Sequence, residues 1–178
     1  MADVTTRIAF LRAVNVGRRK VSMARIVATM EELGYDGVWT HANSGNVVFE
    51  APGTRTAAER SIEKALEKVF GFEVTTFVRT ATELHKAVEV EPFRLAKGDT
   101  YFITFLKAAP SRTVAKALED ASNDFDTLVV RGRDVHWRMR GRSVETRVTS
   151  KTWNLVGDHG STSRNVNLLR RLDTKLRT

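Results

Sequence analysis

Four polar residues near the start of this chain have side chains that suit an anion. Arg12 and Asn15 follow the first apolar run, and Ser44 and Asn46 stand between two later ones. The planar guanidinium fork of arginine and the amide of asparagine together can bind a phosphate or a carboxylate. Asparagine and serine are also common in tight turns, because their side chains bond the nearby backbone. The residue types therefore indicate either a small anionic ligand or two turns, and both interpretations stay open.

A second candidate for anion binding lies near the C-terminus. Arg164 and Asn165 follow three hydroxyl residues and precede or enter a helix expected over residues 164–176. The N-terminus of a helix presents free backbone donors and a partial positive charge to anions. An ordinary helix cap with spare serines is the simpler alternative.

Catalytic and metal chemistry receive less support from the sequence, and no catalytic residue is assigned. The chain has no cysteine, and its four histidines lie on separate segments without the spacing that pairs two imidazoles on one helical face. Residues 157–161 contain Asp158, His159 and Ser161, but three groups so close in one loop rarely reach the geometry of a catalytic triad. Neither a phosphate loop nor a dinucleotide-binding fingerprint occurs. We therefore predict no metal and no cofactor, and an enzyme of unknown reaction is the least favoured interpretation.

The net charge is uneven along the chain. Of 178 residues, 29 are Lys or Arg and 21 are Asp or Glu, which gives a formal charge of +8. Residues 1–90 contribute only +1, whereas residues 91–178 contribute +7. An anionic partner for the second half is therefore plausible.

Nucleic acid is the alternative partner that this charge suggests. A hairpin expected over residues 127–139, with the segment after it, concentrates basic side chains around a tryptophan. Arginines neutralise phosphates, and sheet aromatics stack on bases in ferredoxin-like RNA-binding folds. The aromatic-rich strand typical of those folds is absent, and basic residues also protect a solvated sheet edge. The residues of this interpretation are Arg133, Trp137, Arg138, Arg140 and Arg142.

The order of expected elements indicates an α+β fold. In the first half, Ser22 begins a helix, and a capping box from Thr56 to Glu59 begins a second one. In the second half, a capping box from Thr80 to Glu83 begins a third helix, and Ser111 begins a fourth. Strands are expected over residues 7–14, 38–42, 47–51, 73–79, 100–107, 127–130 and 135–139, and a further short helix over residues 149–156.

This order of strands and helices occurs nearly twice and predicts two ferredoxin-like subdomains of the βαββαβ type. Each would have an antiparallel sheet with helices on one face. We expect the first subdomain over residues 1–80 and the second, with a C-terminal helix, over residues 81–178.

Several of these segments resemble the family known as domain of unknown function 1697. That family has a Leu-Arg-Gly-Ile-Asn-Val-Gly strand end followed by a Ser-Gly-Asn-Val-Val-Phe hairpin. Ala13 and Arg18 stand where the family has further glycines, and Val166 replaces a tryptophan. The family has no established activity, so the resemblance implies the fold and leaves the function open. The matching segments are residues 11–12, 15–17, 44–49, 70–72 and 78–79.

The remaining expectations concern location and partners. The first ten residues lack a long apolar stretch, and no run of about 18 apolar residues exists to cross a bilayer. The sequence therefore predicts a cytoplasmic protein without a membrane partner. It does not assign an oligomeric state.

Overall fold

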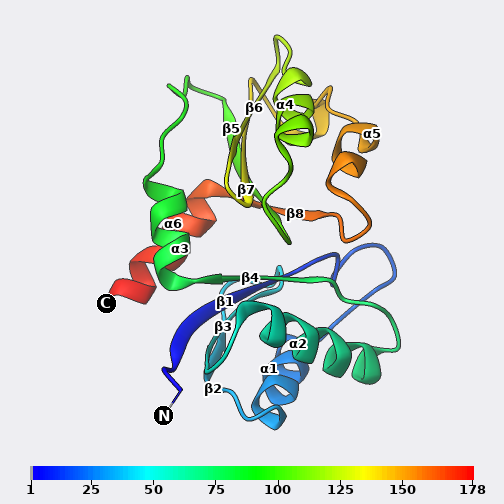
Figure 1. Ribbon diagram of the computed structural model, residues 1–178, viewed down its shortest axis with the longest axis vertical. Coiled ribbons are helices and arrows are strands. Elements are labelled where there is room, and N and C mark those ends of the chain that lie inside the picture. Colours follow the sequence, from blue (N-terminus) through cyan, green and yellow to red (C-terminus); the bar gives the residue numbers. More distant parts are fainter. Residues whose placement is uncertain (1) are drawn as a thin grey trace. The chain divides into compact units, whose positions relative to one another are not determined.

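The computed structural model describes residues 2–178, which form two compact units that divide between Leu84 and His85 (Figure 1). Each unit contains a four-stranded antiparallel sheet with helices. The predicted α+β class, with two ferredoxin-like subdomains, is confirmed. The expected bounds of the two subdomains, residues 1–80 and 81–178, stay a prediction.

The first unit alternates strands and helices in the ferredoxin-like order. Its sheet has the strand order β2-β3-β1-β4, and all neighbouring strands are antiparallel. The central strands β1 and β3 pair from Thr5 opposite Ala51 to Phe10 opposite Asn46. The elements are β1 (Thr5–Leu11), α1 (Met23–Glu32), β2 (Asp36–Thr40), β3 (Asn46–Ala51), α2 (Arg55–Phe70) and β4 (Thr76–Thr80).

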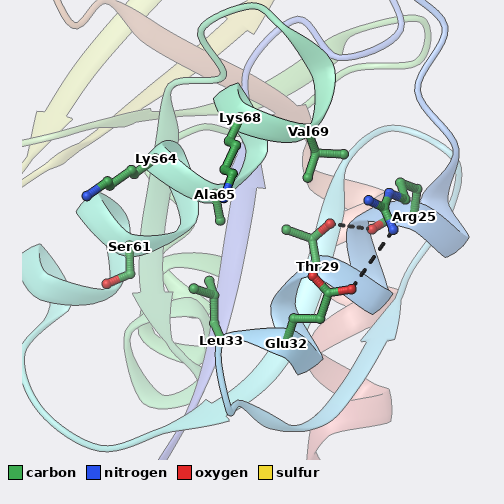
Figure 2. A pocket seen from close by; sticks show the side chains of 9 residues that line it. All are labelled: Arg25, Thr29, Glu32, Leu33, Ser61, Lys64, Ala65, Lys68 and Val69. Atoms are coloured by element: carbon green, nitrogen blue, oxygen red, sulfur yellow. Dashed lines mark hydrogen bonds and ion pairs between the residues drawn. The ribbon is translucent and has the colours of Figure 1, made fainter.

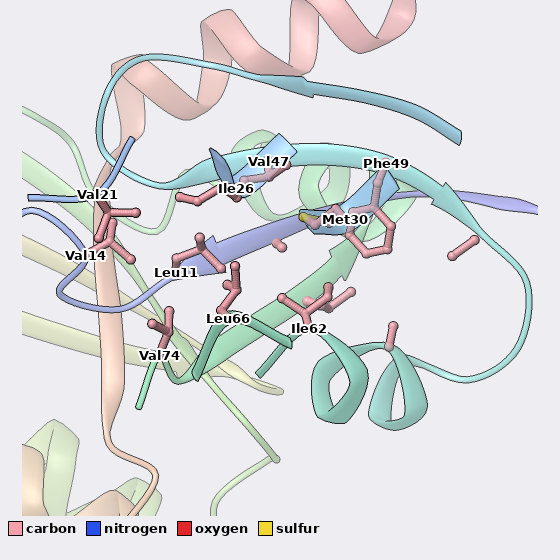
Figure 3. Packing of buried hydrophobic residues seen from close by; sticks show 14 residues of the cluster. Leu11, Val14, Val21, Ile26, Met30, Val47, Phe49, Ile62, Leu66 and Val74 are labelled. Atoms are coloured by element: carbon pink, nitrogen blue, oxygen red, sulfur yellow. The ribbon is translucent and has the colours of Figure 1, made fainter. Parts of the chain in front are cut away.

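The core of the first unit lies between its sheet and the two helices α1 and α2 (Figure 3). Alternate residues of the central strands face the helices, because side chains of a strand point to opposite faces of the sheet in turn. Each helix places an apolar stripe on this face, and burial of each large side chain contributes roughly 1.5 to 3 kcal/mol. Fully or nearly fully buried members are Leu11, Val47, Phe49, Ile26, Met30, Ile62 and Leu66.

The start of α1 was predicted correctly, and the start of α2 was not. Ser22 caps α1 by accepting a hydrogen bond from the Arg25 backbone at 3.3 Å. Helix α2 begins at Arg55, and its cap is Thr54, which accepts from the Ala57 backbone at 3.1 Å. The expected capping box at Thr56 is therefore wrong. Thr54 and Thr56 have equal capping ability, and the acidic partner expected for Thr56 bonds the sheet instead.

That acidic partner is Glu59, a buried residue of α2. Its carboxylate accepts a hydrogen bond from the Val78 backbone of β4 at 3.0 Å and pairs with Arg55 at 3.0 Å. Glu59 is only 3% exposed. It therefore joins α2 to the sheet.

The second unit repeats the strand order of the first as β6-β7-β5-β8. The helix α3 (Ala81–Glu89), which contains the boundary between the units, begins with the predicted capping box, since Thr80 and Glu83 exchange bonds of 2.8 and 3.1 Å. Ser111 caps α4 as predicted. The other elements are β5 (Thr100–Leu106), α4 (Arg112–Asp120), β6 (Asp126–Arg131), β7 (Asp134–Met139), a 3-10 turn (Ser143–Glu145), α5 (Ser150–Trp153), a second 3-10 turn (Asn154–Val156), β8 (Ser161–Asn165) and α6 (Val166–Arg177).

The segment before the last helix differs from its prediction. Residues 161–165 form strand β8, which pairs antiparallel with β5 and places Arg164 opposite Ile103. The segment has no apolar alternation, so its sequence gives no strand signal, and it is ordered by backbone bonds to the open edge of β5. Helix α6 follows β8 directly and begins at Val166, with Asn165 as its cap, whereas the sequence predicted a start at residue 164.

Candidate functional site

The structure brings Asn15 and the turn of the β2–β3 hairpin together at one end of the first sheet. The Asn15 side chain donates to the Asn43 carbonyl at 3.1 Å and accepts from the Val21 backbone at 2.9 Å. The Leu11 backbone donates to the Gly45 carbonyl at 2.8 Å. The loop after β1 and the hairpin turn are therefore linked, as the anion hypothesis requires.

Asn46 is fully buried, and its amide holds the hairpin turn. Its Nδ2 donates to the His41 carbonyl and to the Ser44 hydroxyl, both at 2.9 Å. Two hydrogens on that nitrogen serve two protein acceptors, which leaves no donor for a ligand. Asn46 and Asn15 thus build the turns, in agreement with the simpler of the two interpretations for those two residues.

The loop between β1 and α1 is exposed and basic. Residues 12–20 contain four basic side chains and no acidic one, and every one of the four is exposed. Arg19 lies over the ring of Phe72, with 4.5 Å between the guanidinium carbon and the ring centre. The loop that Asn15 holds therefore carries a local positive charge. The basic residues of this loop are Arg12, Arg18, Arg19 and Lys20.

A groove between α1 and α2 was not anticipated from the sequence. It has a volume of about 740 Å³, and Figure 2 shows its lining side chains on the two helices. Arg25 of α1 and Lys64 and Lys68 of α2 bring three cations, whereas Glu32 brings the one carboxylate of this lining. The signal in the sequence was the spacing of Lys64 and Lys68, which puts both lysines on one helical face.

The groove combines these charges with an apolar wall. Leu33, Ala65 and Val69 line it beside the hydroxyls of Thr29 and Ser61. Arg25 and Glu32 approach to 4.0 Å, and their side chains are 52% and 68% exposed, so this ion pair is weak and opens readily. Glu32 therefore holds Arg25 only weakly within the groove.

Arg164 and Asn165 lie in the second unit and have structural partners there. Arg164 donates from Nη1 to the Thr162 hydroxyl at 2.7 Å and to the Ser163 carbonyl at 3.0 Å. Burial lowers the pKa of its guanidinium to about 10, which leaves it protonated at neutral pH. The Asn165 side chain accepts from the Asn167 backbone at 2.8 Å as the cap of α6.

The basic hairpin of the second unit has its tryptophan inside. Trp137 is 7% exposed, and its indole donates to Asp126 at 2.9 Å and packs against the rings of Phe102 and Trp153. Base stacking requires an accessible ring face. Trp137 therefore belongs to the core of the second unit in this structure.

Three arginines of the same region contact neighbouring groups. Arg140 pairs with Asp99 at 3.1 Å, and Arg142 pairs with Glu145 at 3.5 Å. The half-buried Arg138 lies over Phe93, 5.8 Å from the ring centre. Burial lowers the pKa of Arg138, and the neighbouring Arg140 lowers it further. The Asp99 side chain is 3% exposed and offsets the charge of Arg140, whereas the side chains of Arg142 and Glu145 are 80% and 49% exposed, so their pair is weak.

Within residues 2–178, no group of three or more His, Asp or Glu side chains could hold a metal ion. No helix in that part of the chain has the length and apolar character needed to cross a bilayer.

Comparison with known proteins supports the fold. A sequence model of the family described as protein of unknown function (DUF1697) matches residues 4–136. The solved structure of the conserved bacterial protein SP0830 from Streptococcus pneumoniae is similar, with a TM-score of 0.78 and 18% identity over 99% of this chain and 100% of that one. At this identity the likeness shows the fold alone. No curated protein matches significantly.

Proposed function

This chain belongs to the family described as protein of unknown function (DUF1697), and we propose that it binds a small anionic ligand through its first unit. The match confirms the resemblance seen in the sequence. The observation that carries the proposal is the groove between α1 and α2, where three cations and one carboxylate surround a volume of about 740 Å³. This volume lies within the range of small-molecule sites.

The arrangement favours an anion with more than one charge. Arg25 lines the groove from α1, whereas Lys64 and Lys68 line it from α2, so an anion with several charged groups matches the charges of both helices. Exposed ion pairs contribute at most about 1 kcal/mol each, and several are needed for measurable affinity. Diphosphates and tricarboxylates have suitable charge and size.

The loop residues Arg12, Asn15, Ser44 and Asn46 enter this proposal in two roles. Asn15, Asn46 and Ser44 take part in the bonds that hold the turns, whereas Arg12 belongs to the exposed basic loop. Positive charge on the same unit raises the local concentration of anions and speeds their arrival. Anion binding by Arg164 and Asn165 stays a separate hypothesis for the second unit. Substitution of these two residues tests it independently.

Calorimetric titration with pyrophosphate and with citrate tests the groove. The double variant Lys64→Ser/Lys68→Ser should weaken binding by about tenfold or more, since two charge contacts are lost. The control is Arg60→Ser/Lys116→Ser, which removes the same charge at two exposed helical positions outside the groove. Equal weakening by both variants would indicate general attraction, and absence of binding at physiological salt would reject the proposal.

Nucleic-acid binding through the second half is the alternative proposal. It is supported by the charge of +7 on residues 91–178, and it relies on Arg133, Arg138, Arg140 and Arg142. The buried position of Trp137 counts against the stacking part of it. If the second half binds nucleic acid, affinity for generic RNA or DNA must fall steeply with salt, by about 0.9 log unit of slope for each duplex phosphate contact.

A further inference from the structure

The second unit contains a cavity that the proposed function does not use. It has a volume of about 540 Å³ and is lined by residues 91–95, by Tyr101 of β5 and by Arg170 of α6. Pro92, Phe93 and Leu95 give it an apolar side, and the guanidinium groups of Arg94 and Arg170 give it a cationic one. A cavity with an apolar wall and a few converging polar groups is the usual form of a small-molecule site.

Tyr101 forms a hydrogen-bonded pair with a buried histidine. Tyr101 and His136 are 4% and 1% exposed, and the tyrosine oxygen lies 2.5 Å from Nδ1 of the imidazole. The same oxygen lies 3.4 Å from the Val90 carbonyl. Burial lowers the pKa of His136 to about 4, and burial raises the pKa of Tyr101 well above its usual value. Both groups are therefore neutral at pH 7.

A neutral pair has two hydrogen-bond arrangements. In one, the tyrosine hydroxyl donates to Nδ1, and the oxygen can offer only a lone pair to the cavity. In the other, the imidazole carries its proton on Nδ1 and donates to the tyrosine oxygen, which frees the hydroxyl to donate to Val90 or to a ligand. Tyr101 can thus donate to a ligand without any change in net charge.

The ion pair beside Tyr101 can be opened by a competing anion. Arg170 and Glu91 are 3.5 Å apart, and their side chains are 37% and 74% exposed. Such a pair contributes little, so a ligand carboxylate can replace Glu91 on Arg170 at small cost. Because arginine matches a carboxylate with two parallel bonds, the replacement also gives orientation.

We propose that this cavity binds a small organic carboxylate with an apolar body, whose carboxylate contacts Arg170 and accepts a hydrogen bond from Tyr101. The apolar body packs on Phe93, Pro92 and Leu95. This site lies in the second unit and takes a singly charged, partly apolar ligand. It is therefore distinct in place and in ligand class from the groove of the first unit.

Titration of the intact chain with benzoate tests the proposal. Tyr101→Phe and Arg170→Gln should each weaken benzoate binding by about tenfold or more, because each removes a bond to a charged group. Arg177→Gln is the matched control, since Arg177 lies on the same helix, pairs with Asp173 and does not line the cavity. Its affinity for benzoate should equal that of the parent.

Two further measurements separate this site from general charge attraction. Inorganic phosphate should not displace benzoate, because it cannot use the apolar wall. Nitrogen NMR on the unaltered protein saturated with benzoate should show the His136 proton on Nδ1. Failure of the parent to bind benzoate, displacement by phosphate, or a His136 proton on Nε2 at saturation would overturn the proposal, and none of these readouts depends on how well a variant folds.

Discussion

The two units share one strand order, yet they differ in what connects their third and fourth strands. In the first unit this connection is α2, a helix of 16 residues. In the second unit it is an irregular segment whose only α-helix, α5, has four residues. The same topology is therefore completed in two ways.

In the first unit the connecting helix stabilises the sheet mainly through apolar contacts. Ala58, Ile62 and Leu66 of α2 are buried in the core, and Glu59 adds one bond to the backbone of β4. In the second unit the irregular segment also packs on the core, through Val148, Trp153 and Val156, and the ring centres of Trp153 and Trp137 are 5.2 Å apart. Polar bonds to a buried carboxylate add to these contacts.

Asp126 supplies these polar bonds. Its side chain is fully buried and accepts from the Trp137 indole at 2.9 Å, the Thr146 hydroxyl at 2.6 Å, the Arg147 backbone at 2.9 Å and the Asn123 amide at 3.1 Å. A carboxylate can accept about four bonds, so Asp126 is fully used. The comparison shows that a buried carboxylate holds Thr146 and Arg147 of the irregular segment, where the first unit has a long helix.

The largest expected effect comes from removing this carboxylate. Asp126→Ala leaves several buried donors without an acceptor and should lower the free energy of unfolding of the second unit by about 3 to 5 kcal/mol. Denaturant unfolding followed by Trp137 and Trp153 fluorescence in a Trp39→Phe background measures it. Glu59→Ala in the first unit should cost less, about 1 to 3 kcal/mol. Equal losses would break the comparison.

Protonation of Asp126 in acid should also destabilise the second unit, and this loss of stability should be reversible. Burial by itself raises the pKa of Asp126, but bonds from Thr146, Arg147, Trp137 and Asn123 outweigh it and hold the pKa below its ordinary value of 3.8. The carboxylate therefore stabilises the folded unit fully above that value, and this stability is lost as the pH falls through the lower folded pKa. Unfolding monitored against pH should show this loss in the parent, whereas Asp126→Asn should lack that component.

The hairpin turns give the next contrast. Gly45 and Gly132 both have positive φ, at 75° and 59°. A Cβ on Gly45 would lie 2.8 Å from the Val14 methyl carbon and 3.1 Å from Leu11 Cβ, whereas a Cβ on Gly132 would meet nothing within 4 Å. Gly45→Ala should cost about 2 to 4 kcal/mol, and Gly132→Ala about 1 to 2 kcal/mol, measured by thermal unfolding. If both cost the same, the packing of the first turn contributes nothing.

The same helices and strands show which parts of the fold could be predicted from the sequence. Periodicity and caps predicted the helices that follow Ser22, Thr80 and Ser111, because local bonds decide where those helices begin. Strand β8 was missed since its order depends on pairing with β5, which is distant in sequence. Local chemistry was predictable, and long-range pairing was not.

The candidate sites follow the same division. The link between Asn15 and the hairpin turn could be expected from two turn motifs, although their residue types do not tell a ligand from a turn bond. The groove between α1 and α2 depends on how two helices pack. The sequence suggested that Trp137 is a surface residue beside arginines, but its bond to Asp126 and its ring contacts with Phe102 and Trp153 place it inside.

The corrected start of α2 gives a smaller effect. Thr54→Ala should destabilise the first unit by about 1 kcal/mol, the usual loss for a helix cap. Thr56→Ala, which lies inside the helix, should change stability by less than about 0.5 kcal/mol. Ser111→Ala in the second unit should match Thr54→Ala, because its side chain makes the same bond to Val114 at 3.2 Å. Chemical denaturation of the three variants decides the assignment, and a larger loss at Thr56 than at Thr54 would restore the original placement.

The smallest expected effect concerns backbone strain, in which the units also differ. Within residues 2–178, the non-glycine residues with positive φ are Ala13 and Ala42, at 54° and 59°, and both lie in the first unit. At such positions in the second unit the described residues are glycines, as at Gly98 and Gly157. The left-handed region costs an L-residue about 1 to 2 kcal/mol. Glycine avoids this cost, but it loses more conformational entropy on folding, so its net advantage at such a position is smaller.

Ala13→Gly should therefore stabilise the first unit by about 0.5 to 1 kcal/mol, measured by unfolding followed through Trp39. The family pattern has glycine at this position, and glycine suits the positive φ that Ala13 adopts here. Gly17→Ala, also at positive φ and with open space around its Cβ, is the inverse control and should destabilise by about 1 kcal/mol. If Ala13→Gly is stabilising and leaves pyrophosphate affinity unchanged, the strain is incidental to binding. If it stabilises the fold and weakens pyrophosphate binding together, the strained loop is preorganised for the anion, and the asymmetry between the units is functional.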